Sequence, residues 1–257
     1  MADEAARPHA IDIYQRICED SEEEIDRTAE SLAFSGLFAG FAIGLAPLAL
    51  ALVTVALGAD APATTLVAAL LYPIGYVAVI MGRAQFFTEN TLYPVMLSLR
   101  QPRFWWPTVR ISTVVLATNL LGAFVFAALA VSTDALGAPV RDELVANGAK
   151  YVEGAVGEVF FAAVITGFLL ALVAWLVEAC DGAGARIAVI WALTSLVALG
   201  TFDHCVASTV VVLAALIDGS ASLGDSVAWF APALLGNILG GVLIVTSINY
   251  GQIHDED

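Results

Sequence analysis

A polar stretch, Gly200-Thr201-Phe202-Asp203-His204-Cys205, interrupts an otherwise apolar run over residues 187–216. The run is long enough to cross a bilayer, which needs about 20 apolar residues. Asp203 and His204, near its middle, are costly to remove from water and must face protein or a water-filled path. Gly200 allows the helix to break before them, and ion and substrate sites form at such mid-membrane breaks. We therefore expect a functional role for His204, and expect Asp203 to point away and cap the following half-helix.

The composition indicates a membrane protein. Of the 257 residues, 60% are hydrophobic and 14% are charged, whereas a soluble domain carries about 25% charged residues. Mean hydropathy is +0.85. The predicted class is an all-α polytopic membrane protein. The net charge of −15 leaves no basic footprint for nucleic acid. The three cysteines, Cys18, Cys180 and Cys205, are too widely spaced for a metal site or a disulfide framework, and we expect no cofactor and no metal.

Six apolar spans organise the chain. They are predicted at residues 31–57, 64–99, 107–132, 154–179, 186–217 and 226–248, with breaks in the second and fifth. Together they form a membrane domain over 31–248, between an acidic arm at 1–30 and a short acidic tail at 249–257. The arm lacks the apolar core of a signal peptide. Ile11, Ile13, Tyr14 and Ile17 fall loosely on one side of a helix, so the arm either lies along the membrane surface or is a partly ordered tail.

The basic residues predict the orientation of these spans. Seven fall on the side of the N-terminus: Arg7, Arg16, Arg27, Arg100, Arg103, Arg110 and Arg186. Only Arg141 and Lys150 fall on the other side. An excess of Lys and Arg marks the cytoplasmic face, so both termini are predicted to lie in the cytoplasm, with the spans in the inner or plasma membrane.

A second polar interruption, Gly82-Arg83-Ala84-Gln85-Phe86-Phe87-Thr88-Glu89-Asn90-Thr91, lies in the second span. It is either a break buried inside the bundle or an ordinary loop between two spans. Residues 91–99 are too few to span alone, which favours the break. A lone charge at membrane depth would be uncompensated, so we predict that Arg83 and Glu89 form an ion pair across the break.

The two halves of the chain repeat one pattern. Asn119 and Asn237 are each followed three residues later by Gly, and they are 118 positions apart (237 − 119). The two breaks, at Thr88 and His204, are 116 positions apart (204 − 88). Three spans per repeat require the copies to insert with opposite orientation, and inverted repeats with broken helices place a transport path between them near the midplane. The predicted fold is two inverted three-helix repeats with broken helices 2 and 5.

These motifs, taken together and in this order, resemble the formate/nitrite transporter family. The resemblance rests on Phe86-Phe87-Thr88, Asn119 with Gly122, Leu170-Ala171-Leu172-Val173-Ala174-Trp175, Phe202-Asp203-His204-Cys205-Val206-Ala207, and Gly236-Asn237 with Gly240-Gly241. It covers nearly the whole membrane part. It implies a homo-pentamer of six-span protomers of aquaporin-like architecture, each with its own pore.

The resemblance implies roles for individual residues. His204 matches the central pore histidine, and Thr88 and Asn237 match polar partners lining the same region, with Asn119 as the repeat partner of Asn237. The cytoplasmic constriction falls on Phe86 and Phe87, and the outer constriction on Tyr72, Tyr76 and Val197. The two outer positions that are tyrosines here are usually apolar in the family, so this gate is expected to be wetter.

Three departures from the family pattern leave the substrate open. The first break carries Arg83 and Glu89, where the better-known members are less charged. The family's fourth-span lysine falls on Tyr151, with Lys150 one position away as the candidate for attracting an anion. The run Phe87-Thr88-Glu89-Asn90-Thr91 is typical of a subgroup whose substrate we do not assume to be formate.

The leading hypothesis is passage of a small monovalent anion, such as formate, nitrite or a similar weak-acid anion, either passively or coupled to a proton. Half-helix N-termini after the breaks would offset the cost of desolvating it. His204 would do so by donating either a hydrogen bond or a proton that turns the anion into its neutral acid. The alternative is a neutral-solute or water channel of the same architecture, against which His204 argues. An enzyme using Asp203, His204 and Cys205 is disfavoured, because consecutive helical residues point about 100° apart and cannot form a catalytic line.

Overall fold

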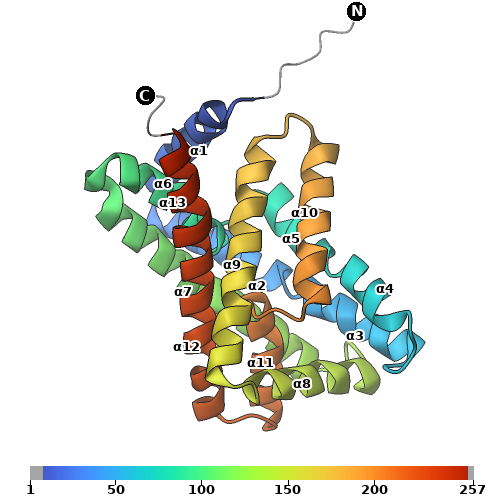
Figure 1. Ribbon diagram of the computed structural model, residues 1–257. Helices are drawn as coiled ribbons and strands as arrows, with labels where there is room; N and C mark the ends of the chain where they lie inside the picture. Colours follow the sequence, from blue (N-terminus) through green and yellow to red (C-terminus); the bar gives the residue numbers. More distant parts are fainter. Residues whose placement is uncertain (1–7, 254–257) are drawn as a thin grey trace, which may run out of the picture.

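A computed structural model describes residues 8–253, and this part of the chain is helical, without a β-strand (Figure 1). Its α-helices are α1 Ala10–Ile25, α2 Ala29–Ala42, α3 Leu45–Leu57, α4 Thr64–Leu71, α5 Pro73–Met81, α6 Tyr93–Arg100, α7 Trp105–Ser132, α8 Ala138–Val152, α9 Val156–Glu178, α10 Ala183–Leu199, α11 Ala207–Asp218, α12 Leu223–Leu239 and α13 Ser247–Ile253. Short 3₁₀ segments lie at Glu89–Thr91 and Pro102–Phe104, and a π-helical segment, Gly240–Thr246, joins α12 to α13.

Five helical segments among residues 8–253 are long and apolar enough to cross a bilayer. They are Ala29–Leu57, Thr64–Met81, Pro102–Ser132, Val156–Glu178 and Leu223–Ile253. The shorter apolar helices α10 and α11 lie on either side of the second break. Large apolar side chains cover much of the outside, and Phe34, Phe161 and Leu235 are each more than half exposed. An exterior of this kind suits lipid and would be an aggregation hazard in water.

The N-terminal helix α1 is docked onto the bundle rather than lying apart from it. Ile13, Tyr14 and Ile17 are buried, in a cluster that includes Met96 of α6 and Trp175 of α9. The expected apolar side of the arm therefore exists, but it covers protein. Polar ties add to this contact, because Arg16 donates to the backbone oxygen of Glu178 at 2.8 Å. Residues 1–7 of the predicted arm lie outside the described part.

Two predicted boundaries differ from the structure. The link between the third and fourth spans contains a helix, α8, which lies across the end of the bundle opposite both termini and packs on α11 (Figure 1). At the other end, the last helical segment continues to Ile253 instead of stopping at residue 248. The π-helical segment, which begins at the glycine pair Gly240-Gly241, lies within this continuous helical stretch.

Glycines allow two helix pairs to approach closely. A Cβ on Gly40 of α2 would collide with the Asn119 backbone of α7, and one on Gly240 would collide with the Val164 backbone of α9. Small residues at such crossings let transmembrane helices pack backbone to backbone. The two contacts bring the asparagines of α7 and α12 close to the two breaks.

Candidate functional site

The helices before the two breaks end in the same way. Arg83 and Thr201 both have positive φ, 52° and 50°. Each helix is closed by a backbone hydrogen bond of 3.0 Å spanning five residues, from Ala84 to Val79 and from Phe202 to Val197. Glycine usually occupies this left-handed position, and a branched residue such as threonine is uncommon there. The chain thus leaves both helices through a strained turn, a feature that recurs at functional sites.

Gly200 has a different role from the one expected. It remains helical at φ −82°, and the turn is made by Thr201. A Cβ on Gly200 would collide with the ring of Phe202. The glycine therefore makes room for the phenylalanine that folds back over the end of α10.

Asn119 of α7 holds the first break in place. Its Oδ1 accepts from the backbone N–H of Phe87 at 2.9 Å. Its Nδ2 donates to the carbonyl oxygens of Gly36 at 2.8 Å and Gln85 at 3.0 Å. The side chain is fully buried. These bonds satisfy backbone groups that a non-helical stretch would otherwise leave unpaired in the bundle.

Asn237 of α12 does the same at the second break. Its Oδ1 accepts from the Cys205 N–H at 2.8 Å, and its Nδ2 donates to the carbonyls of Ala163 at 2.8 Å and Asp203 at 3.1 Å. Both carboxamides, expected to line the pore, are thus used in binding backbone.

The two sets of bonds fix the register between the breaks. Phe87 and Cys205, bonded by the two asparagines, are 118 positions apart (205 − 87), as are Asn119 and Asn237. This register makes Phe86 the counterpart of His204. The prediction from the two halves of the sequence had paired His204 with Thr88. The rings of Phe86 and His204 stack on each other, with centroids 5.3 Å apart and 14° between their planes.

His204 is fully buried, and its two ring nitrogens have different partners. Nδ1 accepts from the backbone N–H groups of Val206 and Ala207, each at 2.9 Å. A nitrogen that accepts two N–H bonds carries no proton, so the ring proton lies on Nε2. Nε2 is 3.4 Å from the hydroxyl of Thr88 in the other break. The ring therefore caps the start of α11 with one edge and presents an N–H with the other.

The predicted capping role of Asp203 was wrong. Its Oδ1 accepts from the indole N–H of Trp229, on α12, at 2.6 Å. The carboxylate is thus bonded to α12. Nδ1 of His204 accepts from the N–H groups at the start of α11 instead.

Aromatic side chains surround His204. Tyr76 of α5 packs edge-on against it, with ring centroids 5.9 Å apart. The hydroxyl of Tyr76 is 3.1 Å from that of Tyr72, so the predicted outer constriction contains a hydrogen-bonded hydroxyl pair. Val197, the third member, is also buried, as is Phe87 of the other predicted constriction.

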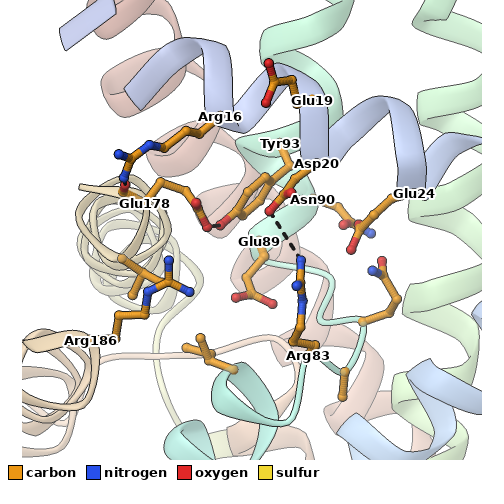
Figure 2. A pocket seen from close by; sticks show the side chains of 14 residues that line it. Arg16, Glu19, Asp20, Glu24, Arg83, Glu89, Asn90, Tyr93, Glu178 and Arg186 are labelled. Atoms are coloured by element: carbon orange, nitrogen blue, oxygen red, sulfur yellow. Dashed lines mark hydrogen bonds and ion pairs between the residues drawn. The ribbon is translucent and has the colours of Figure 1, made fainter. Parts of the chain in front are cut away.

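A cavity of about 260 Å³ lies beside α1 (Figure 2). We call it the α1-side cavity. Its charged lining consists of Arg16, Glu19, Asp20, Glu24, Arg83, Glu89, Glu178 and Arg186. Five carboxyl groups thus face three guanidinium groups. Gln85, Asn90 and Tyr93 also line it, and the Tyr93 hydroxyl donates to Glu178 at 2.9 Å.

The predicted Arg83–Glu89 pair was wrong. Arg83 forms its ion pair with Asp20 of α1, at 3.5 Å, and no ion pair in the described part of the chain includes Glu89 (Figure 2). The prediction assumed that Arg83 is buried, but its side chain is 80% exposed. An exposed guanidinium keeps its hydration and needs no buried partner.

A second cavity, of about 680 Å³, lies at the other end of the bundle. We call it the α8-side cavity, because Glu143, Asn147, Lys150 and Tyr151 of α8 line it together with Tyr72, Val197 and Asp203. Lys150 therefore faces this cavity, as the sequence suggested. The hydroxyl of Tyr72, which lines this cavity, bonds to that of Tyr76, whose ring packs on His204. On the other side, Gln85 lines the α1-side cavity and directly precedes Phe86, whose ring stacks on His204.

Several residues of the site were not predicted. Trp229 orients Asp203, and Glu24, Glu178 and Asn90 line the α1-side cavity. Asn90 belongs to the polar run of the first break, and the others belong to no local motif. For Glu24, the sequence signal was the concentration of acids within the predicted arm, which did not show where in the fold they lie.

A bundle with two broken helices whose ends meet between two cavities defines a channel or transporter architecture. Solved structures agree with this fold. The chain aligns with a chain titled "FNT family ion channel" at a TM-score of 0.85 and 18% identity, covering 94% of this chain and 99% of that one. It aligns with "Pentameric formate channel with formate bound" at a TM-score of 0.76 and 21% identity, covering 88% and 97%.

Sequence comparison gives the family. The family described as "Formate/nitrite transporter" matches residues 11–251, and the chain belongs to it. This is a family of membrane transporters and channels, not of enzymes. One relative is the inner membrane protein YfdC of Escherichia coli (strain K12), 33% identical over 250 residues, or 96% of this chain and 80% of that protein. Another is the uncharacterized transporter YrhG of Bacillus subtilis (strain 168), 27% identical over 201 residues, or 76% and 74%.

Proposed function

We propose that this protein passes a small monovalent anion of a weak acid, such as formate or nitrite, across the inner or plasma membrane. The pathway runs through each protomer of a homo-pentamer, from the α8-side cavity past His204 to the α1-side cavity. Membership in a transporter family and the likeness to a pentameric formate channel support the class. The observation that carries the proposal is the N–H of His204, held toward Thr88 between the two cavities.

This geometry suits an anion because it offers hydrogen-bond donors where the walls are otherwise aromatic. The Nε2–H of His204 and the hydroxyl of Thr88 are the donors at the centre, and the paired hydroxyls of Tyr72 and Tyr76 provide polar contacts on the way in. A hydrogen bond to a charged group contributes about 1.5–3 kcal/mol. Lys150 gives the anion a positive charge to meet in the α8-side cavity.

We infer that His204 acts as a hydrogen-bond donor and not as a proton donor. If Nε2 gave up its proton, the ring would become an anion, because Nδ1 faces two N–H donors and carries none.

The chemically equivalent turns and asparagine bonds of the two breaks support six spans arranged as two inverted repeats. We also assign the chain to the subgroup of the formate/nitrite transporter family that carries the run Phe87-Thr88-Glu89-Asn90-Thr91.

The purified protein in liposomes should pass formate and nitrite faster than it passes water or glycerol. Radiolabelled or dye-reported anion flux and osmotic shrinkage, measured on the same vesicles, test this. Water or glycerol flux without anion flux at any pH would favour the alternative, a neutral-solute channel of the same architecture.

The orientation follows from the basic residues, and we propose that the α1-side cavity opens to the cytoplasm. In intact cells, a membrane-impermeant thiol reagent should modify Asp60→Cys and Ser220→Cys and spare Glu23→Cys and Gly182→Cys. All four positions are exposed. The background is Cys180→Ser, since Cys18 and Cys205 are buried. The reverse labelling pattern would place the α1-side cavity outside the cell.

A further inference from the structure

The α1-side cavity contains two amide groups with unused hydrogen-bonding capacity. Gln85 and Asn90 are 4% and 3% exposed and both line the cavity. Among the buried side-chain atoms of the described residues, Gln85 Oε1 and Asn90 Nδ2 have no hydrogen-bond partner. A buried polar atom without a partner is costly. These two are complementary, since Oε1 accepts and Nδ2 donates.

A ligand that satisfies both atoms must supply one donor and one acceptor. A carboxylate or nitrite ion only accepts, and a metal ion or ammonium only binds acceptors. An undissociated carboxylic acid supplies an O–H and a C=O on one carbon. The amide pair therefore fits the neutral form of a small weak acid better than its anion.

The charge of the cavity leads to the same conclusion. Carboxyl groups outnumber guanidinium groups in its lining, and two of the arginines are occupied, Arg83 with Asp20 and Arg16 with Asp181. Burial also raises the pKa of Glu24 in α1, although a hydrogen bond with the side chain of Gln85 partly opposes this. A raised carboxyl pKa means that the site disfavours additional negative charge. An anion is repelled here, while its neutral acid is not.

Glu89 lies between this cavity and the central site. It directly follows Thr88, whose hydroxyl faces His204, and it points into the cavity (Figure 2). Arg83 and Tyr93, which flank Glu89 in the chain, line the cavity with it. The charged groups that face Glu89 from other elements are Arg16, Glu19, Asp20 and Glu24 of α1, Glu178 of α9 and Arg186 of α10. Glu89 has no ion pair in the described part of the chain, so its carboxyl group is free to exchange a proton.

We propose that the α1-side cavity is a binding site for the undissociated acid form of the substrate, in which Glu89 exchanges the proton. An anion entering the cell passes His204 and then takes a proton from the Glu89 carboxyl, giving a neutral acid in the cavity and the Glu89 carboxylate. The carboxylate is reprotonated by hydronium from the cytoplasm, and the neutral acid leaves through the mouth of the cavity. Exit from the cell reverses these steps. This inference rests on the proposed function and adds the group that His204, as a fixed donor, does not supply.

The test uses proteoliposomes with radiolabelled formate and a luminal pH dye, between about pH 5 and about pH 8. Glu89→Gln should lower formate flux by about a hundredfold at the upper pH, the smaller end of the range for a lost general acid. The defect should shrink toward the lower pH, where the bulk solution supplies the neutral acid. Glu89→Asp, which retains a carboxyl group, should restore part of the flux at the upper pH.

Glu23→Gln is the matched control. It removes a carboxyl group from the exposed face of α1, outside the lining of the cavity, and should leave the pH profile unchanged. Asn90→Leu, similar in volume but without the donor, should raise the KM for formate at low pH about fivefold, the value of one hydrogen bond.

The inference is overturned if Glu89→Gln lowers flux equally at all pH values, or leaves the profile as in the wild type. It is also overturned if Glu89→Asp fails to restore flux in a correctly assembled protein, or if Glu23→Gln gives the same change as Glu89→Gln. Failure of the proposed function is distinct, because then the wild-type protein itself would pass no formate at any pH.

Discussion

Replacing His204 by phenylalanine should lower anion flux by about 10- to 100-fold, the equivalent of one hydrogen bond to a charged substrate. The phenyl ring fits the space and can stack on Phe86, but it lacks the N–H that faces Thr88. It also lacks the Nδ1 acceptor that binds the N–H groups of Val206 and Ala207. Liposome flux and thermal unfolding of the same preparations measure the two losses together.

Two further substitutions separate these roles of the ring. His204→Asn places an oxygen near the position of Nδ1, so it should keep the cap of α11 and the stability while losing flux, because the amide does not reach Thr88. His204→Gln places its amide nitrogen near the position of Nε2, so it should retain part of the flux while unfolding at a lower temperature. Wild-type flux through a folded His204→Asn protein would show that the Nε2–H is not used.

Replacing Asn237 by leucine should destabilise the protein severely. The leucine side chain has a similar volume, but it leaves the Cys205 N–H and the carbonyls of Ala163 and Asp203 without their side-chain partner. Each buried polar group without a partner costs about 1–3 kcal/mol. Flux should be lost because the second break, with His204 on it, is no longer held. Thermal unfolding in detergent and liposome flux provide the measurement.

The control for this prediction is Asn249→Leu, in the last helix. Asn249 is half-buried, and among the described residues its amide donates to the Val245 carbonyl of its own helical segment alone. Its loss should change stability by well under half of the Asn237 effect. Asn119→Leu should match Asn237→Leu, since Asn119 makes the equivalent bonds at the first break. Equal, small effects at all three positions would mean that the breaks hold without the asparagines.

The amino-acid sequence by itself determined the class of the protein, the location of both breaks and the pairing of Asn119 with Asn237. These follow from local properties, because apolar length decides which segments can enter lipid, and a charged interruption must leave the lipid-facing helix. The family resemblance was also in the sequence, and the family match over residues 11–251 confirmed it.

The tertiary structure decided what each polar side chain binds. Arg83 reaches Asp20, and Asp203 reaches Trp229, across separations that no local pattern reveals. The tautomer of His204 depends on two backbone N–H groups whose directions are set by how α11 leaves the break. Hydrogen bonds depend on distance and angle within a few tenths of an ångström. Such geometry arises only when helices from both halves of the chain pack together, and that packing also brings the acids of α1 over the cavity beside Glu89.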